Sequence, residues 1–314
     1  MLNKPLTQFL LACALALILP LALKSGVLAS EILVYGLAAA ACNLLLSYTG
    51  LLSFGQGVFF GVGSYLAALL LTRAGVGAPL SLIACALVGA ALATFVGAIS
   101  IRRQGVYFVM LTLAFAQFFY FLAYTFQDVT GGDNGILDVP RPIIAGRALA
   151  SPWSYYVFVA VVFLVLFAAL LQATRSMFGR TLLAIRENEE RAAAIGYPVK
   201  AFKIAAFALS GAVTGVAGGL DAMLIGGAPL SNVEYHSSET ILIMTVIGGG
   251  NLIASLLGAG AYLILGDLLS DVWPRWLLLF GLFLIVVALF FQGGLWGLVE
   301  LAARRSERAD EAEA

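Results

Sequence analysis

The chain has 314 residues, of which 62% are hydrophobic and only 11% carry a charge. A soluble protein of this length needs a far more charged surface, so this composition excludes an ordinary soluble globular domain. The 17 acidic and 17 basic residues cancel, which leaves no basic field for nucleic acid.

Long apolar runs follow one another along almost the whole chain. A helix needs about 20 such residues to cross a bilayer. We therefore predict an all-α protein, a polytopic transmembrane helical bundle of about ten spans. The predicted spans cover residues 6–23, 31–47, 56–72, 80–99, 105–126, 153–172, 201–220, 238–247, 252–269 and 275–291. The eighth span is short and runs into three glycines, which predicts a broken or re-entrant helix.

The first span leaves two alternatives open. Lys4, the apolar stretch and the Val27-Leu28-Ala29 sequence fit a secretory signal, and its cleavage would leave about nine spans. The stretch is longer than the roughly 7–15 residues of a signal core, which favours an uncleaved helix. Residues 1–303 then form one transmembrane domain, and residues 304–314 form a charged, disordered tail.

Lysines and arginines gather on one side of this topology when the N-terminus is cytoplasmic. The outside segments hold Lys24, Arg73, Arg141, Arg147 and Arg275. The inside segments hold Lys4, Arg102, Arg103, Arg175, Arg180, Arg186, Arg191, Lys200, Lys203, Arg304, Arg305 and Arg308. Because basic residues concentrate in cytoplasmic loops, we expect both termini and the loop at 174–200 in the cytoplasm. The loops at 128–152 and 221–239 would face the other side.

Glycines recur at four-residue steps in two of the predicted spans. Gly57 and Gly61 share one helix face in the third span, and Gly211, Gly215 and Gly219 share one in the seventh. Small residues at this spacing let helix backbones approach closely. We predict tight helix packing at all five positions.

Several polar side chains lie within or beside apolar spans, where an unpaired polar group is costly. Some of them flank Gly50 and Gly55, which interrupt the helical pattern before the third span. Polar groups beside a broken helix suit a passage for a polar solute. We predict that five residues line such a path: Asn43, Ser53, Gln56, Thr112 and Gln117.

The stretch from Arg175 to Pro198 combines dense mixed charge with apolar residues at helical spacing. This pattern predicts one or two short amphipathic helices in the cytosol, ended by Gly196 and Pro198. A solvated linker is the alternative interpretation. A linker needs no patterned apolar face, so a docking surface for a partner protein fits better. The expected apolar positions are Leu182, Ile185, Ala192, Ala193 and Ile195.

Three stretches in register resemble one family. They are GLLSFGQGVFFGVGSY at 50–65, TGGDNGI at 130–136, and the long stretch at 175–220 that begins RSMFGRTLLAIRENEERAAAIGYP. Together they resemble the LivM-like permease subunit of branched-chain amino-acid ABC importers, the hydrophobic amino acid uptake family. The resemblance covers about residues 30–295. Where the family often has His, this chain has Gln56, which leaves the solute open between amino acids, urea and short amides.

The resemblance implies a multi-pass subunit of the bacterial inner membrane, surrounded by lipid. Its implied partners are an H-type permease, two cytoplasmic ATP-binding subunits and a periplasmic solute-binding protein. ATP would be bound by those partners, so this chain carries no cofactor and no catalytic or metal site, and it is not an enzyme. For the acidic residues and the histidine of the outward loops, two interpretations stay open, simple solvation of each side chain, which is favoured, and contact with the binding protein: Asp128, Asp133, Asp138, Glu234 and His236.

The resemblance also assigns a coupling role to the charged loop. The segment from Glu190 to Gly196 is similar to the EAA-x-x-x-G coupling loop of ABC permeases, although Arg191 interrupts the compact spacing. Such a loop seats in a cleft of the ATPase and would transmit its motion to the spans on either side. The implied coupling residues are Arg180, Arg186, Glu187, Glu190, Ala192, Ala193 and Gly196.

Other functional classes have less support in the sequence. No lysine lies in a G-x-x-x-x-G-K-[ST] context, so a P-loop ATPase is excluded. An intramembrane enzyme would have to use the single histidine, His236, which has no cluster of metal ligands at suitable spacing. An ion-coupled secondary transporter needs acidic residues in mid-membrane. The candidates, Asp221 and Asp267, are predicted near helix ends within reach of water. A channel remains the third alternative.

Overall fold

A computed structural model describes residues 5–23, 25–144, 147–149, 151–272, 275–290 and 294–297. The predicted tail at 304–314 and the basic residues Lys4 and Lys24 lie outside the described residues. Within them the chain is helical, apart from one short hairpin of two-residue strands, β1 (Ile143–Ile144) and β2 (Arg147–Ala148). The predicted helical class is confirmed.

The elements follow one another closely along the chain. The first half contains α1 (Pro5–Ala22), α2 (Gly26–Asn43), the π-helix η1 (Leu44–Thr49), α3 (Gln56–Thr72), α4 (Ala78–Ser100), α5 (Val106–Thr125), α6 (Gln127–Thr130) and the 3₁₀ turn η2 (Gly132–Asn134). The second half contains α7 (Pro152–Arg175), α8 (Met177–Glu187), α9 (Glu189–Ala194), α10 (Val199–Ile225), the 3₁₀ turn η3 (Leu230–Asn232), α11 (Tyr235–Gly248), α12 (Leu252–Val272) and α13 (Trp276–Phe290).

Six helices among the described residues are long and apolar enough to cross a membrane, by length and composition. They are Gly26–Thr49, Ala78–Ser100, Val106–Thr125, Pro152–Arg175, Val199–Ile225 and Leu252–Asp271. Three shorter apolar helices, Thr7–Ala22, Gln56–Thr72 and Trp276–Ile285, fall below that length. The structure therefore supports a multi-pass bundle but not the predicted count of about ten spans.

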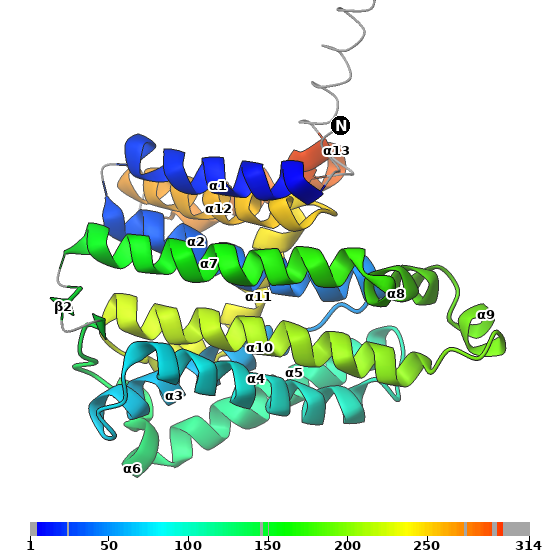
Figure 1. Ribbon diagram of the computed structural model, residues 1–314, viewed down its shortest axis with the longest axis horizontal. Coiled ribbons are helices and arrows are strands. Elements are labelled where there is room, and N and C mark those ends of the chain that lie inside the picture. Colours follow the sequence, from blue (N-terminus) through cyan, green and yellow to red (C-terminus); the bar gives the residue numbers. More distant parts are fainter. Residues whose placement is uncertain are drawn as a thin grey trace, which may run out of the picture.

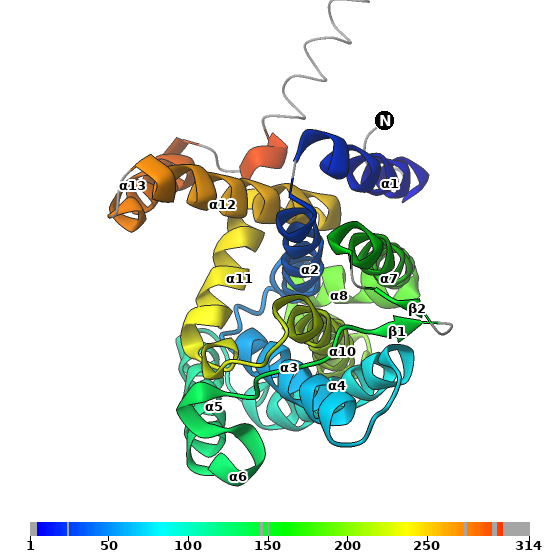
Figure 2. The ribbon, with the colours of Figure 1, turned by 90° about the vertical axis from the view of Figure 1, so that its left-hand side faces the viewer.

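Two of the discrepancies have a clear structural cause. α3 is short because the chain enters the protein as non-helical backbone over residues 50–55, with Ser53 and Gln56 already buried. α11 is short because it runs across the bundle: Figure 2 shows it passing from the side of α5 to α12, while α2, α7 and α10 are seen nearly end-on. Apolar helices of this kind pack within the bundle without spanning the membrane.

α10 lies at the centre of the bundle and contacts α2, α3 and α4, as Figure 2 shows in the end-on view. Within the 18-residue apolar stretch of each helix, 78% is buried in Gly26–Thr49, which contains α2, and 78% in α10, against 22% in α5. α5 is therefore a peripheral helix. α1 packs on α7, where the Tyr156 hydroxyl donates to the carbonyl oxygen of Ala16.

Glycines allow the close approach of α10 to α3 and α4. A Cβ placed at Gly211 would lie 2.7 Å from the carbonyl oxygen of Gly89, and one at Gly215 would lie 2.7 Å from that of Cys85. A Cβ at Gly219 would lie 3.1 Å from the Cys85 sulfur. Real Cβ atoms do not fit 2.7 Å from an oxygen, so larger residues at Gly211 and Gly215 would force the helices apart.

The glycines of α3 face a different neighbour. A Cβ at Gly57 would lie 2.7 Å from the Ser238 hydroxyl oxygen of α11, and one at Gly61 would meet the backbone of Val233. The segment between α10 and α11 thus lies directly against α3.

The bundle has two distinct ends, which Figure 1 shows on opposite sides. We call the end with α8 and α9 the coupling end and the end with β1, β2 and α6 the hairpin end. The loops at 174–200 and 128–152 lie at opposite ends, in agreement with the predicted topology. The hairpin-end loop also joins the end of α10, because Ile136 and Ala228 pair as an isolated antiparallel bridge.

The segment at 221–239 differs from the predicted outward loop. α10 continues to Ile225, and the chain then folds back into the bundle along α3, where Asn232 and Val233 are only 5% and 1% exposed. Asp221 is 1% exposed and its Oδ2 accepts a hydrogen bond from Asn232 at 2.9 Å. The expectation that Asp221 reaches water is therefore wrong, because the re-entrant segment covers it; Asp267 is exposed as expected.

Candidate coupling site

The loop between α7 and α10 folds into two short helices because each has its own cap. The Ser176 hydroxyl accepts from the backbone N–H of Phe178 at 3.2 Å and begins α8. The Asn188 side chain accepts from the N–H of Arg191 at 2.8 Å and begins α9. Side-chain caps of this kind satisfy backbone donors that a helix leaves unpaired. The chain turns away after α9 at Gly196, whose φ is +100°.

The two helices have one buried and one exposed face. Leu182, Ile185 and Ala192 point into the protein, and each is less than 5% exposed. The predicted coupling residues lie outside, except Ala192: Arg180, Arg186, Glu187, Glu190, Ala193 and Gly196 are exposed.

Apolar side chains also remain exposed on this loop. Met177 and Ile195 are 69% and 72% exposed, and Leu183 and Tyr197 are also uncovered. Of the five expected apolar positions, Ala193 and Ile195 belong to this exposed set. Apolar groups among charges on the polar end of a bundle indicate a surface that another protein covers.

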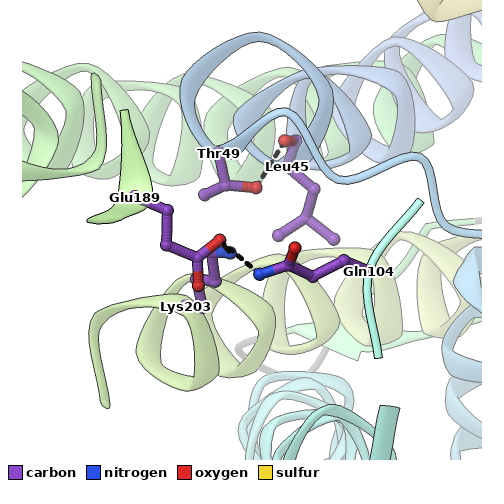
Figure 3. Close-up of polar contacts among 5 residues, drawn as sticks. All are labelled: Leu45, Thr49, Gln104, Glu189 and Lys203. Atoms are coloured by element: carbon purple, nitrogen blue, oxygen red, sulfur yellow. Dashed lines mark hydrogen bonds and ion pairs between the residues drawn. The ribbon is translucent and has the colours of Figure 1, made fainter. Parts of the chain in front are cut away.

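Glu189 fastens the start of α9 to two other elements, as Figure 3 shows. Its Oε2 accepts from Lys203 Nζ of α10 at 2.5 Å and from Gln104 Nε2, between α4 and α5, at 3.1 Å. The Lys203 side chain is only 6% exposed and that of Glu189 is 35% exposed. A largely buried ammonium with a carboxylate partner makes a strong charge-assisted hydrogen bond. α9 is therefore tied to the bundle at its first residue.

Arg186 fastens the end of α8 to η1. Its Nη1 donates to the carbonyl oxygen of Ser47, and its side chain lies against Gly50, where a Cβ would sit 3.3 Å from Arg186 Cγ. Gly50 has φ +71° and ends η1. Single-turn π-helices are frequent at functional sites. Arg186, Glu189 and Lys203 line an open cleft of about 230 Å³ between the loop and the bundle.

Sequence reasoning identified Arg186 in this site but missed its partners. Two of these partners, Ser47 and Gln104, are far from the loop in sequence. Lys203 belongs to the predicted span that follows the loop. Glu189 is one of several acidic residues in the loop, and nothing local distinguishes it from the others. A lysine followed by an apolar helix, as at Lys203, was the available signal for a buried cation.

The predicted path residues lie mostly inside the subunit. Gln56 Nε2 donates to the Ser210 hydroxyl at 2.9 Å, and Thr214 donates to Gln56 Oε1 at 2.8 Å. The Asn43 Nδ2 donates to the Gly249 carbonyl at 2.7 Å and to the Ser255 hydroxyl at 3.0 Å. Both side chains are 0% exposed. They join α2, α3, α10 and the corner between α11 and α12.

Ser53 and Thr112 are also buried, and both hold the chain that leads into α3. Ser53 accepts from the N–H of Gly55 at 3.1 Å, and Thr112 accepts from the N–H of Phe54 at 3.2 Å. Gln117 is exposed on α5. Contact of these five residues with a solute stays a prediction. No group of three or more His, Cys, Asp or Glu side chains that could hold a metal occurs in the described part of the chain.

A profile of the family described as "Branched-chain amino acid transport system / permease component" matches residues 26–290. The chain belongs to this permease family. The LivM-like character inferred from the three sequence stretches is thereby confirmed.

Curated relatives of this permease are also transport proteins. It is 28% identical to the high-affinity branched-chain amino acid transport system permease protein LivM of Escherichia coli K12 over 292 residues, which cover 85% of this chain and 69% of the relative. The LivM protein of Salmonella typhimurium LT2 matches equally. The L-arabinose transport system permease protein AraH of Escherichia coli K12 is 33% identical over 148 residues, 47% of this chain and 42% of that protein. No solved structure matches.

The family match covers both the bundle and the candidate coupling site. It includes α2 through α13, and it begins after α1. The permease is therefore a multi-pass membrane protein of a family of transport permease subunits.

Proposed function

We propose that this chain is one permease subunit of an ATP-binding-cassette importer for branched-chain or related amino acids. It would form half of a solute path and couple to separate ATPase subunits through α8 and α9. The observation that carries the proposal is the coupling end itself. Two capped helices present charges and uncovered apolar groups outward and are fastened by Glu189 and Arg186 to three elements of the bundle.

The proposed complex contains a second, H-type permease, two cytoplasmic ATP-binding subunits and a periplasmic solute-binding protein. ATP would be bound by the ATP-binding subunits, and this chain would bind no cofactor. The exposed acidic residues of the hairpin end, including Asp128 and Asp133, would meet the binding protein. The coupling end would lie in the cytoplasm of a bacterium, with the bundle in the inner membrane and both termini inside.

A proline placed in α9 tests the coupling role. Ala193→Pro removes a backbone donor from the interior of a six-residue helix and clashes with the preceding turn. In the complete complex reconstituted in proteoliposomes, we expect loss of solute-stimulated ATP hydrolysis, with membrane insertion intact.

The matched control is a proline in the same loop where the backbone accepts it. Met177 is the first residue of α8, and the preceding Ser176 has the extended conformation that a following proline requires (φ −68°, ψ 177°). Because Met177 also contributes an exposed apolar side chain to this surface, the reference for Met177→Pro is Met177→Ala, and the two variants should show equal stimulated hydrolysis. Wild-type activity in Ala193→Pro would remove the coupling role from α9.

The proposed solute follows from the LivM relatives, which belong to branched-chain amino acid transport systems. We expect the complex to take up leucine, isoleucine or valine when supplied with ATP and a binding protein. Uptake of urea or of short amides in preference to these amino acids would select the alternative solute class within the same family.

One observation favours a more remote alternative, an ion-coupled secondary transporter. Asp221 is buried in the bundle, and its Oδ1 has no hydrogen-bond partner among the described residues. Buried carboxyl groups at such positions serve ion coupling in secondary transporters. Nucleotide-independent uptake that an ionophore abolishes would establish this alternative. Uptake that requires ATP would reject it.

A further inference from the structure

α11 begins about half-way along the bundle. Its Ser238 hydroxyl donates to the Phe54 carbonyl at 2.6 Å and accepts from the Gly57 N–H at 2.8 Å. The neighbouring Gln56 bonds to Ser210 and Thr214 of α10. Ser210 and Thr214 lie about 15–25 Å from the start of α10, which is about 40 Å long. The first turn of α11 is therefore at mid-depth.

Ionisable side chains are exposed on this turn. Ser238 is 0% exposed and points into the protein, whereas His236 and Glu239 project outward from the same turn. Their side chains are 66% and 42% exposed, and His236 Nδ1 lies 3.0 Å from Glu239 Oε2. The exposed ring of Tyr235 packs edge-on against that of His236, with centroids 5.9 Å apart.

The surrounding exposed surface at similar depth is apolar. α4 exposes Leu87 and Phe95, and α5 exposes Leu113 and Phe118. These faces suit lipid. A charged side chain that faces lipid at mid-depth costs about 3 kcal/mol, so such groups normally face protein or a water-filled cavity. The exposed face of α11 is therefore a poor lipid surface and a good wall of a wet path.

We propose that Tyr235, His236 and Glu239 form a binding site for the charged ends of an α-amino acid, on a solute path between this subunit and a second permease subunit. This inference rests on the proposed function and names the contact that recognises the solute. It replaces the interpretation that His236 meets the binding protein.

The chemistry of the pair fits a zwitterion. The contact between His236 and Glu239 uses one ring nitrogen and one carboxylate oxygen, and leaves Nε2 and Oε1 without a partner in the described part of the chain. Oε1 can accept from an ammonium group. Nε2 can donate to a carboxylate when the ring carries both protons. The Tyr235 ring offers an apolar surface for an aliphatic side chain.

Cysteine labelling tests whether the site is wet and whether it holds the solute. Cys42 and Cys85 are buried, so only Cys13 needs replacement for the background. In the reconstituted complex, Thr240→Cys, one turn beyond His236 on α11, leaves the proposed site intact and should react with a charged, membrane-impermeant thiosulfonate, whereas the matched Phe118→Cys on α5 should not. Leucine should slow the reaction at 240 more than leucinamide, which lacks the carboxylate, or isocaproate, which lacks the ammonium. Equal inertness at both positions would overturn the proposal.

Uptake measurements separate recognition from a structural role. Glu239→Gln and His236→Gln should each reduce leucine uptake by about tenfold, the value of one charged hydrogen bond. The exchange His236→Glu with Glu239→His keeps both groups one turn apart and should restore part of the uptake. Leu113→Ala, on the exposed apolar face of α5, serves as the control and should transport like wild type.

The outcomes distinguish the two proposals. Wild-type protein without ATP-dependent leucine uptake would refute the proposed function. Wild-type uptake that is unchanged in Glu239→Gln and His236→Gln would refute only this site.

Discussion

At the scale of single residues, the contact between Glu189 and Lys203 couples the loop to the bundle in a way that stability measurements can resolve. Glu189→Ala would leave the largely buried Lys203 ammonium without its carboxylate. We expect the free energy of unfolding to fall by about 1–3 kcal/mol, toward the lower value because Glu189 is partly exposed. Lys203→Met should lower it by less, since Glu189 can reach water.

A double-mutant cycle is the decisive form of this measurement. The variant with both changes should be destabilised by less than the sum of the single variants, because the second change removes the group that the first left unpaired. Thermal unfolding midpoints of the detergent-purified complex measure all four proteins. Strict additivity would mean that the contact contributes nothing.

The residue types at the coupling loop could be predicted from sequence, but their partners could not. The helical pattern identified Leu182, Ile185 and Ala192 as apolar positions of a face for a partner protein, but in the structure these three side chains are buried within this subunit. Ile195 was counted with them and is exposed, because the chain leaves the helix at that residue and the helical period no longer applies. Gln104 is 85 residues from Glu189 in sequence, and no local pattern encodes such a contact.

The buried polar residues show the same limit. Polar side chains in apolar spans suggested a solute path, yet Asn43 and Gln56 bond within the subunit. Burial penalises an unpaired amide whether the partner is a solute or a neighbouring helix. The sequence alone cannot distinguish these cases.

At the scale of elements, α8 is joined to η1 by the hydrogen bond from Arg186 to Ser47. η1 continues α2, whose Asn43 contacts the corner between α11 and α12. These contacts connect the candidate coupling loop with the helix that carries the proposed solute site. They supply a physical connection, and its energetic coupling is a matter for measurement.

Arg186→Lys is the informative change at this joint. Lysine retains the charge but lacks the planar fork of donors that reaches the Ser47 carbonyl. In the reconstituted complex, we expect fewer solute molecules taken up per ATP hydrolysed, by about fivefold. Arg103→Lys, between α4 and α5 at the same end, is the control for a general charge effect. Equal ratios in the two variants would argue against a role for this hydrogen bond.

The crossing of α4 and α10 depends on glycine, and a methyl group is enough to test it. In Gly215→Ala the new Cβ would lie 2.7 Å from the Cys85 carbonyl oxygen, which is backbone and cannot rotate away. We expect the free energy of unfolding to fall by about 1–3 kcal/mol, measured as a lower midpoint of thermal unfolding.

Gly260→Ala provides the opposite case. Its nearest neighbour is Ile32 Cγ2 at 3.8 Å, an ordinary contact, and the position lies inside α12. Alanine should therefore leave stability unchanged or raise it by up to about 1 kcal/mol. If both variants behave alike, close backbone approach does not limit the α4–α10 crossing.

The number of spans was the part of the fold that apolar runs predicted least well. A run of about 17 apolar residues is compatible with a span, a core helix or a re-entrant piece. The glycines after the eighth run correctly indicated a broken helix, but nothing local showed that α11 would lie across the bundle. The fold-back of residues 226–234 depends on α3 and on the bridge between Ile136 and Ala228, which are distant in sequence.

At the scale of the whole molecule, basic residues divide unequally between the two ends. Among the described residues, the coupling end carries Arg102, Arg103, Arg175, Arg180, Arg186, Arg191, Lys200 and Lys203, and the hairpin end carries Arg73, Arg141 and Arg147. Arg275 lies between α12 and α13. Cytoplasmic loops carry the excess of such residues. This asymmetry predicts a cytoplasmic coupling end, independently of how many helices cross the membrane.

Vesicles of known sidedness test this orientation. In a chain with Cys13 replaced by serine, Glu190→Cys on α9 and Asp133→Cys on η2 place exposed thiols at opposite ends. An impermeant maleimide should label position 190 only in inside-out vesicles and position 133 only in right-side-out vesicles. Labelling of 190 from outside would invert the topology. The exposed apolar groups of α8 and α9 would then face the periplasm, away from any ATP-binding subunit, and the coupling proposal would fail even if the complex transports amino acids.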